Sequence, residues 1–285
     1  MSSMTDQRES LWRLLTHEDA AHRLQGLELL RVRPGLAEAM ALRIRERPHR
    51  APNFTPPFDV VCALAQHTDV ELQFGVYNGP LDRLQPGVER VVGLRDLSLS
   101  GQGSLRVREL EGLETLSAFE VLVPGGPGPR LRTASCRVAA DELGLWSEVP
   151  TLSLSLTSAP SMEQLLLLTG RRQFLCLETP GPVDTPVFDA MSLVLNGFAP
   201  TAHAYGQSGS VALNCCVLSE VVTLDLPTVK LYQNRGMREL VLGPETRRAL
   251  VQANPGLEHV RVEGAVDLLD FQVDVPATFV GCERP

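Results

Sequence analysis

A short pattern of apolar residues repeats along most of the sequence and limits the folds that the chain can adopt. From residue 94 onward the 285-residue chain repeats the order apolar-x-x-apolar-x-apolar, mostly at intervals of 18 to 23 residues. Numbered by the fourth residue of each unit, the pattern recurs at positions 97, 116, 134, 152, 175, 193, 211, 224, 240, 260 and 269. Apolar residues two positions apart share one face of a β-strand, so each unit predicts a short strand. Self-similarity at this period is typical of a solenoid, whose turns bury their apolar faces by stacking.

The repeated unit resembles that of the leucine-rich-repeat family, L-x-x-L-x-L-x-x-N, over residues 94–273. The resemblance implies an α/β solenoid with a parallel β-sheet on its concave face. The ninth position matches the family only at Cys216, whereas the other units that we assign hold Gln102, Val121, Thr157, Phe198, Glu245 and Ala265 there. Two intervals, 211 to 224 and 260 to 269, are also too short for a standard turn. We therefore expect an irregular leucine-rich-repeat solenoid.

Segments between the strands predict further elements. Residues 161–168 are expected to form a helix on the convex side, with Ser161 as its N-cap. Residues 245–253 are expected to form a second helix, which ends at Asn254-Pro255-Gly256. The proline- and glycine-rich residues 123–129 can only form a loop.

The first 50 residues show helical spacing instead of strand alternation. Apolar residues at positions 11, 12, 14 and 15, then 24, 27, 30 and 32, then 36, 40 and 44 predict three short helices. Thr16 and Asp19 are spaced as an acidic capping box for the second helix, and Pro48 and Pro52 are expected to end the third. We therefore expect a small N-terminal helical cap over residues 1–50.

The remaining boundaries follow from the composition. Residues 51–92 are a transitional segment, in which 60–65 and 70–76 are apolar enough to form a helix and a strand. The solenoid is expected over residues 93–275, and residues 276–285 are expected to form a C-terminal tail.

The family resemblance implies that positions three, five and seven of each unit face the concave side and form a binding surface. Threonines and serines recur there at intervals of 18 residues, and later units become charged. The candidate partner-binding residues are Thr115, Ser117, Phe119, Thr133, Ser135, Arg137, Thr151, Ser153, Asp225, Glu239, His259 and Arg261. The alternative is that serine and threonine simply suit the solvated face of a strand.

No motif in the sequence predicts catalysis, a cofactor or a metal. The adjacent Cys215 and Cys216 lie near His203, but zinc sites need a second ligand pair at short spacing, and none is present. The glycines of residues 124–129 lack the lysine and the hydroxyl residue of a phosphate-binding loop. The repeat therefore favours a non-enzymatic scaffold that binds another protein.

Charge and cysteine spacing bear on partners and compartment. The net charge of −8 argues against nucleic-acid binding. Residues 1–50 hold 9 basic and 7 acidic residues, whereas the rest hold 17 and 27, so an acidic inhibitor or immunity-like protein for a basic partner is an alternative. A small-molecule site or enzyme pocket near His67 and Tyr77 is a third alternative. The chain shows no signal peptide, no membrane span and no CxxC pair, which predicts free thiols and a cytoplasmic location.

Overall fold

The structure is a computed structural model that describes residues 4–50, 57–70, 72, 76–84, 88, 91, 93–200, 205, 208–264, 266–271 and 276–280. The chain divides into two compact units, Met1–Val121 with Gly128–Leu131, and Leu122–Pro127 with Arg132–Pro285. None of the helices in the described residues is long and apolar enough to cross a membrane.

The first unit begins with helices α1 (Met4–Leu15), α2 (Ala20–Val32) and α3 (Ala37–Arg50), with a 3-10 turn, η1 (Pro34–Leu36), before α3. This confirms the three predicted helices, with two corrections. Asp19 is the N-cap of α2, because its carboxylate accepts the Ala21 N–H at 2.9 Å, and this bond lowers the pKa of Asp19. Thr16 instead donates its hydroxyl to the Trp12 carbonyl at 2.8 Å, at the end of α1. Pro48 does not end α3, because the helix continues for two residues beyond it, to Arg50. Pro52 lies outside the described residues.

These helices pack through a small apolar core. Leu11, Trp12, Leu15, Leu30, Met40 and Ile44 are buried. Gly26 lets α2 approach α1 closely, because a Cβ at this position would lie 2.9 Å from the Leu15 side chain. The Arg43 guanidinium lies 4.3 Å from the centre of the Trp12 ring and donates to Glu9 at 2.8 Å. Leu24 is 60% exposed, so the predicted apolar stripe of α2 is buried only in part.

The first unit continues with α4 (Phe58–His67), which confirms the helix expected at 60–65. The first described strand, β1 (Val76–Pro80), starts at the last residue of the expected segment 70–76, of which residues 71 and 73–75 lie outside the described part. After η2 (Leu81–Arg83) come β2 (Asp96–Ser100), β3 (Gly103–Ser104) and β4 (Thr115–Leu122). Strands β1 and β2 are parallel, as are β2 and β4.

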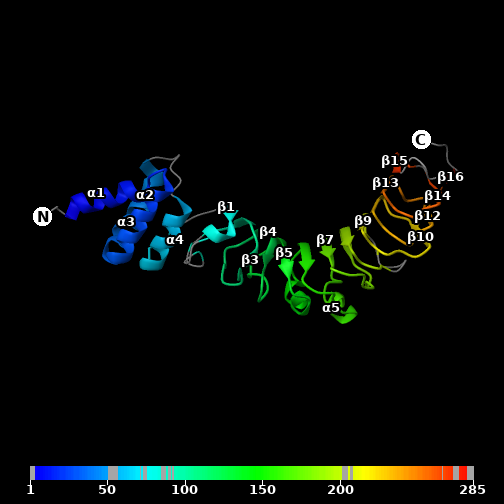
Figure 1. Cartoon of the computed structure of the whole chain (residues 1–285), viewed down its shortest axis with the longest axis horizontal. Helices are drawn as coiled ribbons and strands as arrows, with labels where there is room; N and C mark the ends of the chain where they lie inside the picture. Colours follow the sequence, from blue (N-terminus) through cyan, green and yellow to red (C-terminus); the bar gives the residue numbers. More distant parts are fainter. Residues whose placement is uncertain are drawn as a thin grey trace. The chain divides into compact units, whose positions relative to one another are not determined.

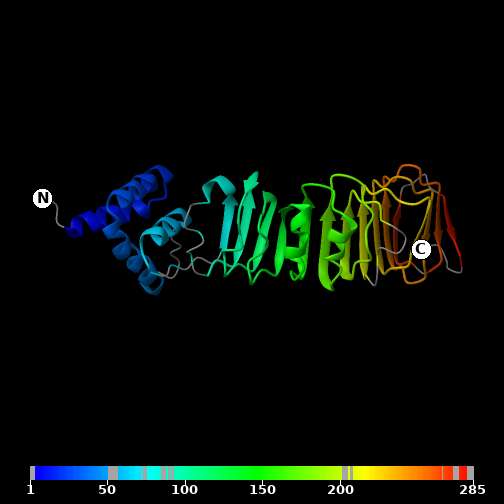
Figure 2. The same cartoon turned by 90° about the horizontal axis from the view of Figure 1, so that it is seen from below.

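The second unit is a parallel β-solenoid. Its main sheet has eight strands among the described residues, in the order β5, β6, β7, β8, β9, β11, β13, β15, which stand side by side in Figure 2. Their bounds are β5 (Thr133–Val138), β6 (Thr151–Leu156), β7 (Arg172–Glu178), β8 (Ala190–Asn196), β9 (Ser210–Asn214), β11 (Thr228–Tyr232), β13 (Arg248–Gln252) and β15 (Leu268–Phe271). We call this the main sheet.

Four further strands form a second parallel sheet, β10 (Val221–Leu224), β12 (Glu239–Leu242), β14 (His259–Val262) and β16 (Ala277–Phe279). In Figure 1 these strands lie across the C-terminal turns from β9, β13 and β15. The last turns therefore hold two strands each, with their apolar residues buried between the sheets: Val229, Leu231, Ala249 and Val251 on one side, and Val222, Leu224, Leu240, Leu242, Val260 and Val262 on the other.

This arrangement corrects the predicted alignment of the C-terminal repeats. The units numbered 224, 240 and 260 lie on the second sheet, whereas 211 and 269 lie on the main sheet. The two short intervals therefore join strands of different sheets within one turn. In the main sheet Ser210 pairs with Thr228 and Thr228 with Arg248, which restores steps of 18 and 20 residues.

Of the three predictions for the connecting segments, two are confirmed and one is wrong. Residues 140–146 form the 3-10 helix η4 (Ala140–Trp146), and α5 (Met162–Leu166) confirms the helix expected after Ser161. The helix expected over 245–253 is wrong, because this segment contains β13, whose backbone pairs with both β11 and β15. Residues 124–125 lie in a turn, and no helix or strand occupies 123–129, as expected of a loop.

The cap of α5 provides a small stability test. Ser161 accepts the Gln164 N–H at 3.3 Å, and Gln164 Oε1 accepts the Ser161 N–H at 2.7 Å, which forms a capping box. Ser161→Ala is expected to lower the free energy of unfolding by about 1 kcal/mol. Chemical denaturation followed by circular dichroism measures the loss. Ser158→Ala, at an exposed serine just before the cap, is the control and should leave the unfolding midpoint unchanged.

Candidate protein-binding face

Along each strand of the main sheet, successive side chains alternate between the buried inner face and the opposite face. On β5, Ala134, Cys136 and Val138 are buried, and on β6, Leu152, Leu154 and Leu156 are buried. The residues between them point to the other face, as strand alternation requires. We call this other side of the main sheet the outward face.

The structure brings five of the predicted binding residues together on this face. Thr133 pairs in register with Thr151, and Ser135 with Ser153, and all four are half-buried. Arg137, on the same side of β5, is exposed. In the first unit, Thr115, Ser117 and Phe119 alternate with buried residues on β4, and Phe119 is 52% exposed.

The other four predicted residues do not lie on the main sheet. Glu239, His259 and Arg261 belong to the second sheet, where Glu239 and His259 are register partners. The Arg261 guanidinium pairs with Glu263. Asp225 follows β10, and its carboxylate accepts the Glu245 N–H at 2.7 Å, which holds the next turn in place. Their assignment to one face with the serines and threonines was wrong, because alternation alone does not tell which of two sheets holds a strand.

The centre of the outward face is apolar, a feature that the sequence analysis missed. Cys176, Val194 and Ala212 are register partners on β7, β8 and β9, and all three are half-buried. Phe174 on β7 and Leu250 on β13 are also half-buried, but the exposed Lys230 separates Leu250 from Ala212. Burial raises the pKa of the Cys176 thiol, so this side chain behaves as a small apolar group. The signal that could have found Cys176, Val194, Ala212 and Leu250 is the correct register, which places them at position five of their units, whereas Phe174 is at position three.

Amide and phenol groups border this centre at the carboxyl ends of the strands. Asn214 donates its side-chain amide to Asn196 at 2.8 Å across β9 and β8. Tyr232 on β11 is 46% exposed, and the Gln233 amide donates to its hydroxyl at 3.4 Å. Gln252 donates to Asp270 at 3.2 Å. The outward face therefore combines an apolar centre with a polar margin, as protein interfaces do.

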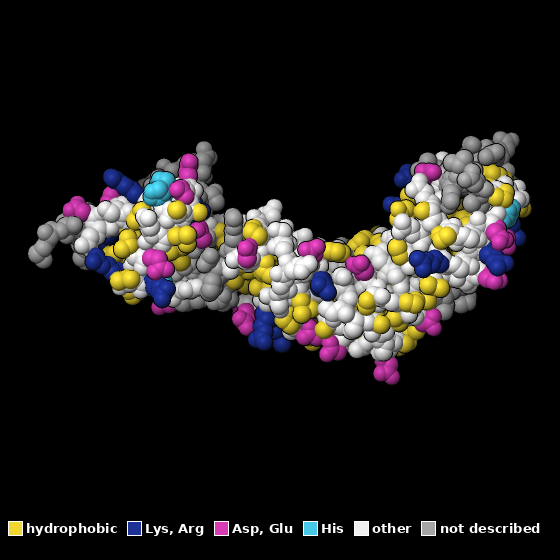
Figure 3. Space-filling view, in the orientation of Figure 1, with side chains coloured by type: hydrophobic (Ala, Val, Ile, Leu, Met, Phe, Trp, Pro, Cys, Tyr) yellow, Lys and Arg dark blue, Asp and Glu magenta, His cyan; other side chains and the backbone are white. Residues whose placement is uncertain are grey.

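Charges on the outward face are mixed in sign. Basic side chains come from Arg137, Lys230 and Arg248, and acidic ones from Glu178 and Asp270. Figure 3 likewise shows both signs interspersed with apolar side chains over the solenoid turns. The acidity of the sequence is therefore not concentrated on this face.

Buried amides hold the turns that follow β9, β11 and β13. Asn234 is fully buried; its Oδ1 accepts the Cys216 N–H at 3.0 Å, and its Nδ2 donates to the Leu213 carbonyl at 2.8 Å. Asn254 repeats this one turn later, since its Oδ1 accepts the Asn234 N–H at 3.0 Å. Cys216, Asn234 and Asn254 form a ladder at steps of 18 and 20 residues. They stand at the ninth position of units that begin at residues 208, 226 and 246; the predicted alignment included Cys216 but not Asn234 and Asn254.

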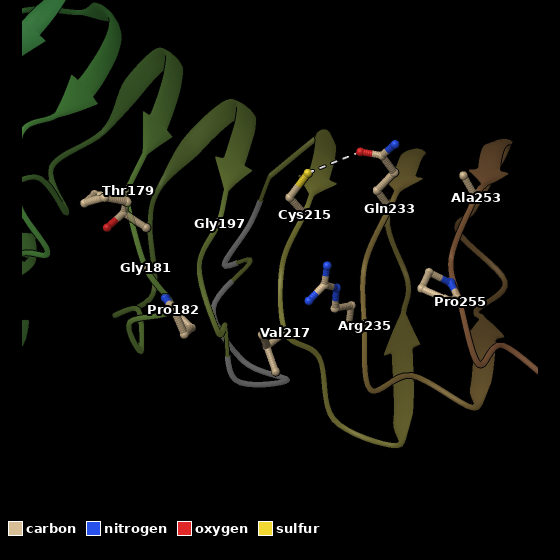
Figure 4. A pocket seen from close by; sticks show the side chains of 11 residues that line it. Thr179, Gly181, Pro182, Gly197, Cys215, Val217, Gln233, Arg235, Ala253 and Pro255 are labelled. Carbon is tan, nitrogen blue, oxygen red and sulfur yellow. Dashed lines mark hydrogen bonds between the residues drawn. The ribbon is translucent and has the colours of Figure 1, made fainter.

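A groove runs along the carboxyl edge of the main sheet, just beyond this ladder. Its volume is about 620 Å³. The residues before the ladder positions, Cys215, Gln233 and Ala253, have φ of 53°, 56° and 53°, so successive turns share one left-handed bend. The Cys215 thiol donates to Gln233 Oε1 at 3.5 Å (Figure 4). The groove is lined by Thr179, Pro180, Gly181, Pro182, Gly197, Cys215, Val217, Gln233, Arg235, Ala253 and Pro255.

The two residues proposed for a small-molecule pocket line different cavities of the first unit. Tyr77 lines one of about 580 Å³, beside the Arg23–Asp59 ion pair at 3.2 Å, and its ring lies 4.3 Å from that of Phe58. His67 lines another of about 700 Å³. The structure therefore does not bring these two side chains into one site.

The described cysteines do not form a metal site. Cys62, Cys136, Cys176, Cys215 and Cys216 are thiols that form no disulfide, whereas Cys282 and His203 lie outside the described residues. Burial raises the pKa of Cys136 to about 12 and that of Cys216 to about 11. In the part of the chain that the structure describes, no group of three histidine, cysteine or acidic side chains could hold a metal ion.

Comparisons with protein-family models, with curated proteins and with solved structures find no match for this chain.

Proposed function

We propose that this protein is a non-enzymatic scaffold that binds another protein, rather than a nucleic acid or a membrane, through the outward face of the main sheet. The observation that supports this most is the half-exposed apolar row of the register partners Cys176, Val194 and Ala212, with Phe174 beside it on β7. A stacked parallel sheet holds such a row rigidly, so little conformational entropy is lost when a partner covers it.

The margins of the face support the same proposal. Hydroxyl groups lie on β5 and β6, and amides, Tyr232 and charges of both signs lie along the other strands. Removing apolar surface from water supplies affinity, while polar groups at the rim fix orientation. This division suits a folded partner or a long segment of one.

A pair of matched substitutions tests which face binds. Val194→Arg places a charge at the apolar centre of the outward face, whereas Val221→Arg places one on the second sheet, where Val221 is 52% exposed. Tagged full-length wild type and both variants are incubated with native lysate, and the captured proteins are quantified by mass spectrometry. We expect Val194→Arg to lower recovery of a specific partner by about tenfold or more, because the added guanidinium must lose its water at the centre of the contact.

We expect Val221→Arg to recover as much of the specific partner as the wild type does. Equal recovery with both variants, selective loss with Val221→Arg, or no protein captured above an unrelated control would contradict the proposal. Circular dichroism spectra of the three proteins should coincide, because both valines lie at solvent-accessible positions.

A second candidate is an acidic inhibitor of a basic partner. The exposed side chains of Asp141, Glu148 and Glu163 favour it, because they lie in the segments that connect the strands of the main sheet. Binding by this route should weaken as salt is raised from low to physiological concentration, whereas binding through the apolar row should change little. A salt titration of the captured complex separates the two candidates.

We also propose that the solenoid is of the leucine-rich-repeat type, with the main sheet on its concave face. The Cys216, Asn234 and Asn254 ladder supports this, because it satisfies backbone groups at the turn where the family's repeat has asparagine or cysteine. The free thiols support a cytoplasmic location, where cysteines stay reduced.

A further inference from the structure

Among the described residues, one charged side chain lines the groove along the carboxyl edge of the main sheet, and its charge is positive. Arg235 lies between Val217 and Pro255, and its guanidinium is directed toward the Cys215 side of the groove (Figure 4). No described acidic side chain forms an ion pair with it. A cation that no described acidic side chain pairs with, on a chain of net charge −8, is complementary to an anionic group of a partner.

The remainder of the lining is mostly apolar. Pro180 and Pro182 form one end of the groove, and Val217, which is 45% exposed, and Pro255 flank the arginine. The backbone of the floor offers few free donors, because Gly197 N–H, Cys215 N–H and Gln233 N–H already donate to the following turn. An occupant would therefore be recognised through side chains rather than by adding a strand.

We propose that this groove binds an extended acidic peptide segment of the partner. A carboxylate of the segment pairs with Arg235, and its apolar side chains lie against Pro182, Val217 and Pro255. This inference deepens the proposed function and rests on it in one respect, that the partner is a protein.

The dimensions of the groove fit such a segment. Its floor crosses the turns of Gly197, Cys215, Gln233 and Ala253, and neighbouring strands are about 4.8 Å apart, so it spans about 14 Å. An extended peptide rises about 3.3 Å per residue, so four or five residues cover this length. The volume of about 620 Å³ is in the ordinary range for ligand sites.

The groove is also continuous with the outward face. Gln233 joins the two, since its Nε2 donates to the Tyr232 hydroxyl and its Oε1 accepts from the Cys215 thiol. Tyr232 and Arg235 thus expose a phenol and a guanidinium on either side of the buried Asn234. Tyrosine and arginine are the residue types that contribute most to interface energies together with tryptophan. A partner that covers the outward face could extend an acidic segment into the groove.

A peptide selection tests this proposal. Random heptapeptides displayed on phage are selected on the full-length protein, and enriched peptides are labelled and titrated by fluorescence anisotropy. We expect enriched sequences to combine Asp or Glu with apolar residues. Arg235→Ala should weaken their Kd by about tenfold to a hundredfold, since it removes a charge-assisted hydrogen bond. Replacing the peptide's acidic residues by glutamine or asparagine should have a similar effect.

Arg238→Ala is the matched control, because Arg238 is exposed in the same turn but does not line the groove. It should leave the Kd within about twofold. Bound peptide should also slow alkylation of Cys215, read by mass spectrometry. The proposal is overturned if no peptide is enriched, if enriched peptides lack acidic residues, or if Arg235→Ala and Arg238→Ala have equal effects.

The two proposals fail in distinguishable ways. Loss of the lysate partner with Val194→Arg, together with failure of the peptide test, would support binding through the face and reject the groove. Peptide binding that depends on Arg235, together with partner capture that is insensitive to Val194→Arg, would support the groove and reject the face.

Discussion

Replacing Asn234 by alanine is expected to lower the free energy of unfolding by about 3–4 kcal/mol, the largest effect of any single side chain in the ladder. The side chain is fully buried and bonds the Cys216 N–H, the Leu213 carbonyl and the Asn254 side chain, at 3.0, 2.8 and 3.0 Å. Alanine leaves the Cys216 N–H without its acceptor and the Leu213 carbonyl without this donor, whereas Asn254 Oδ1 still accepts the backbone N–H of residue 234. Each unsatisfied group in the solenoid interior costs about 1–3 kcal/mol.

Guanidinium chloride denaturation followed by circular dichroism measures this effect. Asn214→Ala is the matched control, since Asn214 is half-buried and its side chain donates only to Asn196. It should cost less than about 1 kcal/mol. Equal shifts of the unfolding midpoint in both variants would mean that Asn234 does not hold the turn.

Arg172→Leu is the second substitution with a large expected effect. Arg172 is 3% exposed and stands at the first position of its repeat unit, where other units hold Val149, Ala190 and Leu226. Its guanidinium donates to the Leu168 carbonyl at 3.3 Å, to the Ser147 carbonyl at 2.6 Å and to the Val149 carbonyl. These bonds join the end of η4 to the segment after α5.

Leucine restores the apolar character of the repeat but leaves these carbonyls without their donor. We expect a loss of about 2–4 kcal/mol, because hydrogen bonds to a charged group are worth about 1.5–3 kcal/mol each and leucine packing recovers part of the sum. Arg171→Leu, at the exposed preceding arginine, is the control and should change stability by less than about 0.5 kcal/mol. A neutral or stabilising Arg172→Leu would show that packing at this position outweighs the carbonyl bonds.

The early turns of the second unit could be predicted from the sequence because each holds one strand of the main sheet. Thr133 and Thr151, and Ser135 and Ser153, are register partners at the predicted spacing of 18 residues. Ser161 was likewise identifiable as an N-cap, because the capping box is a local feature. Local hydrogen bonding and a regular repeat period were therefore sufficient to predict the strand register of β5 and β6 and the start of α5.

In the later turns, the sequence does not show which of the two sheets each strand belongs to. Residues 226–234 and 237–242 both fit apolar-x-x-apolar-x-apolar, yet they belong to β11 and β12, on different sheets. Only Asn234, at the ninth position of the first, distinguishes them. The segment 245–253 has apolar spacing that suits a helix, but pairing with β11 and β15 stabilises it as a strand. The predicted placement on one face is therefore confirmed for the hydroxyls of β5 and β6 and wrong for Glu239, His259 and Arg261, which lie on the second sheet.

The groove was beyond sequence analysis for a different reason. Its lining comes from turns whose residues are 18 to 20 positions apart, such as Cys215, Gln233 and Ala253, and none of them forms a recognised motif. Their left-handed backbone also gives no signal, because only Gly197 among the bends is a glycine.

Site-resolved alkylation of an introduced thiol tests most directly the claim that the outward face binds the partner. Thr228→Cys places a thiol on the outward face of β11, and Thr223→Cys places one on the exposed side of β10, five residues earlier on the other sheet. Each variant is alkylated with and without the captured partner, and labelling at the introduced thiol is followed by mass spectrometry. The account predicts that the partner slows labelling in Thr228→Cys severalfold and leaves Thr223→Cys unchanged. Undiminished labelling at position 228, or protection at position 223 instead, would contradict it.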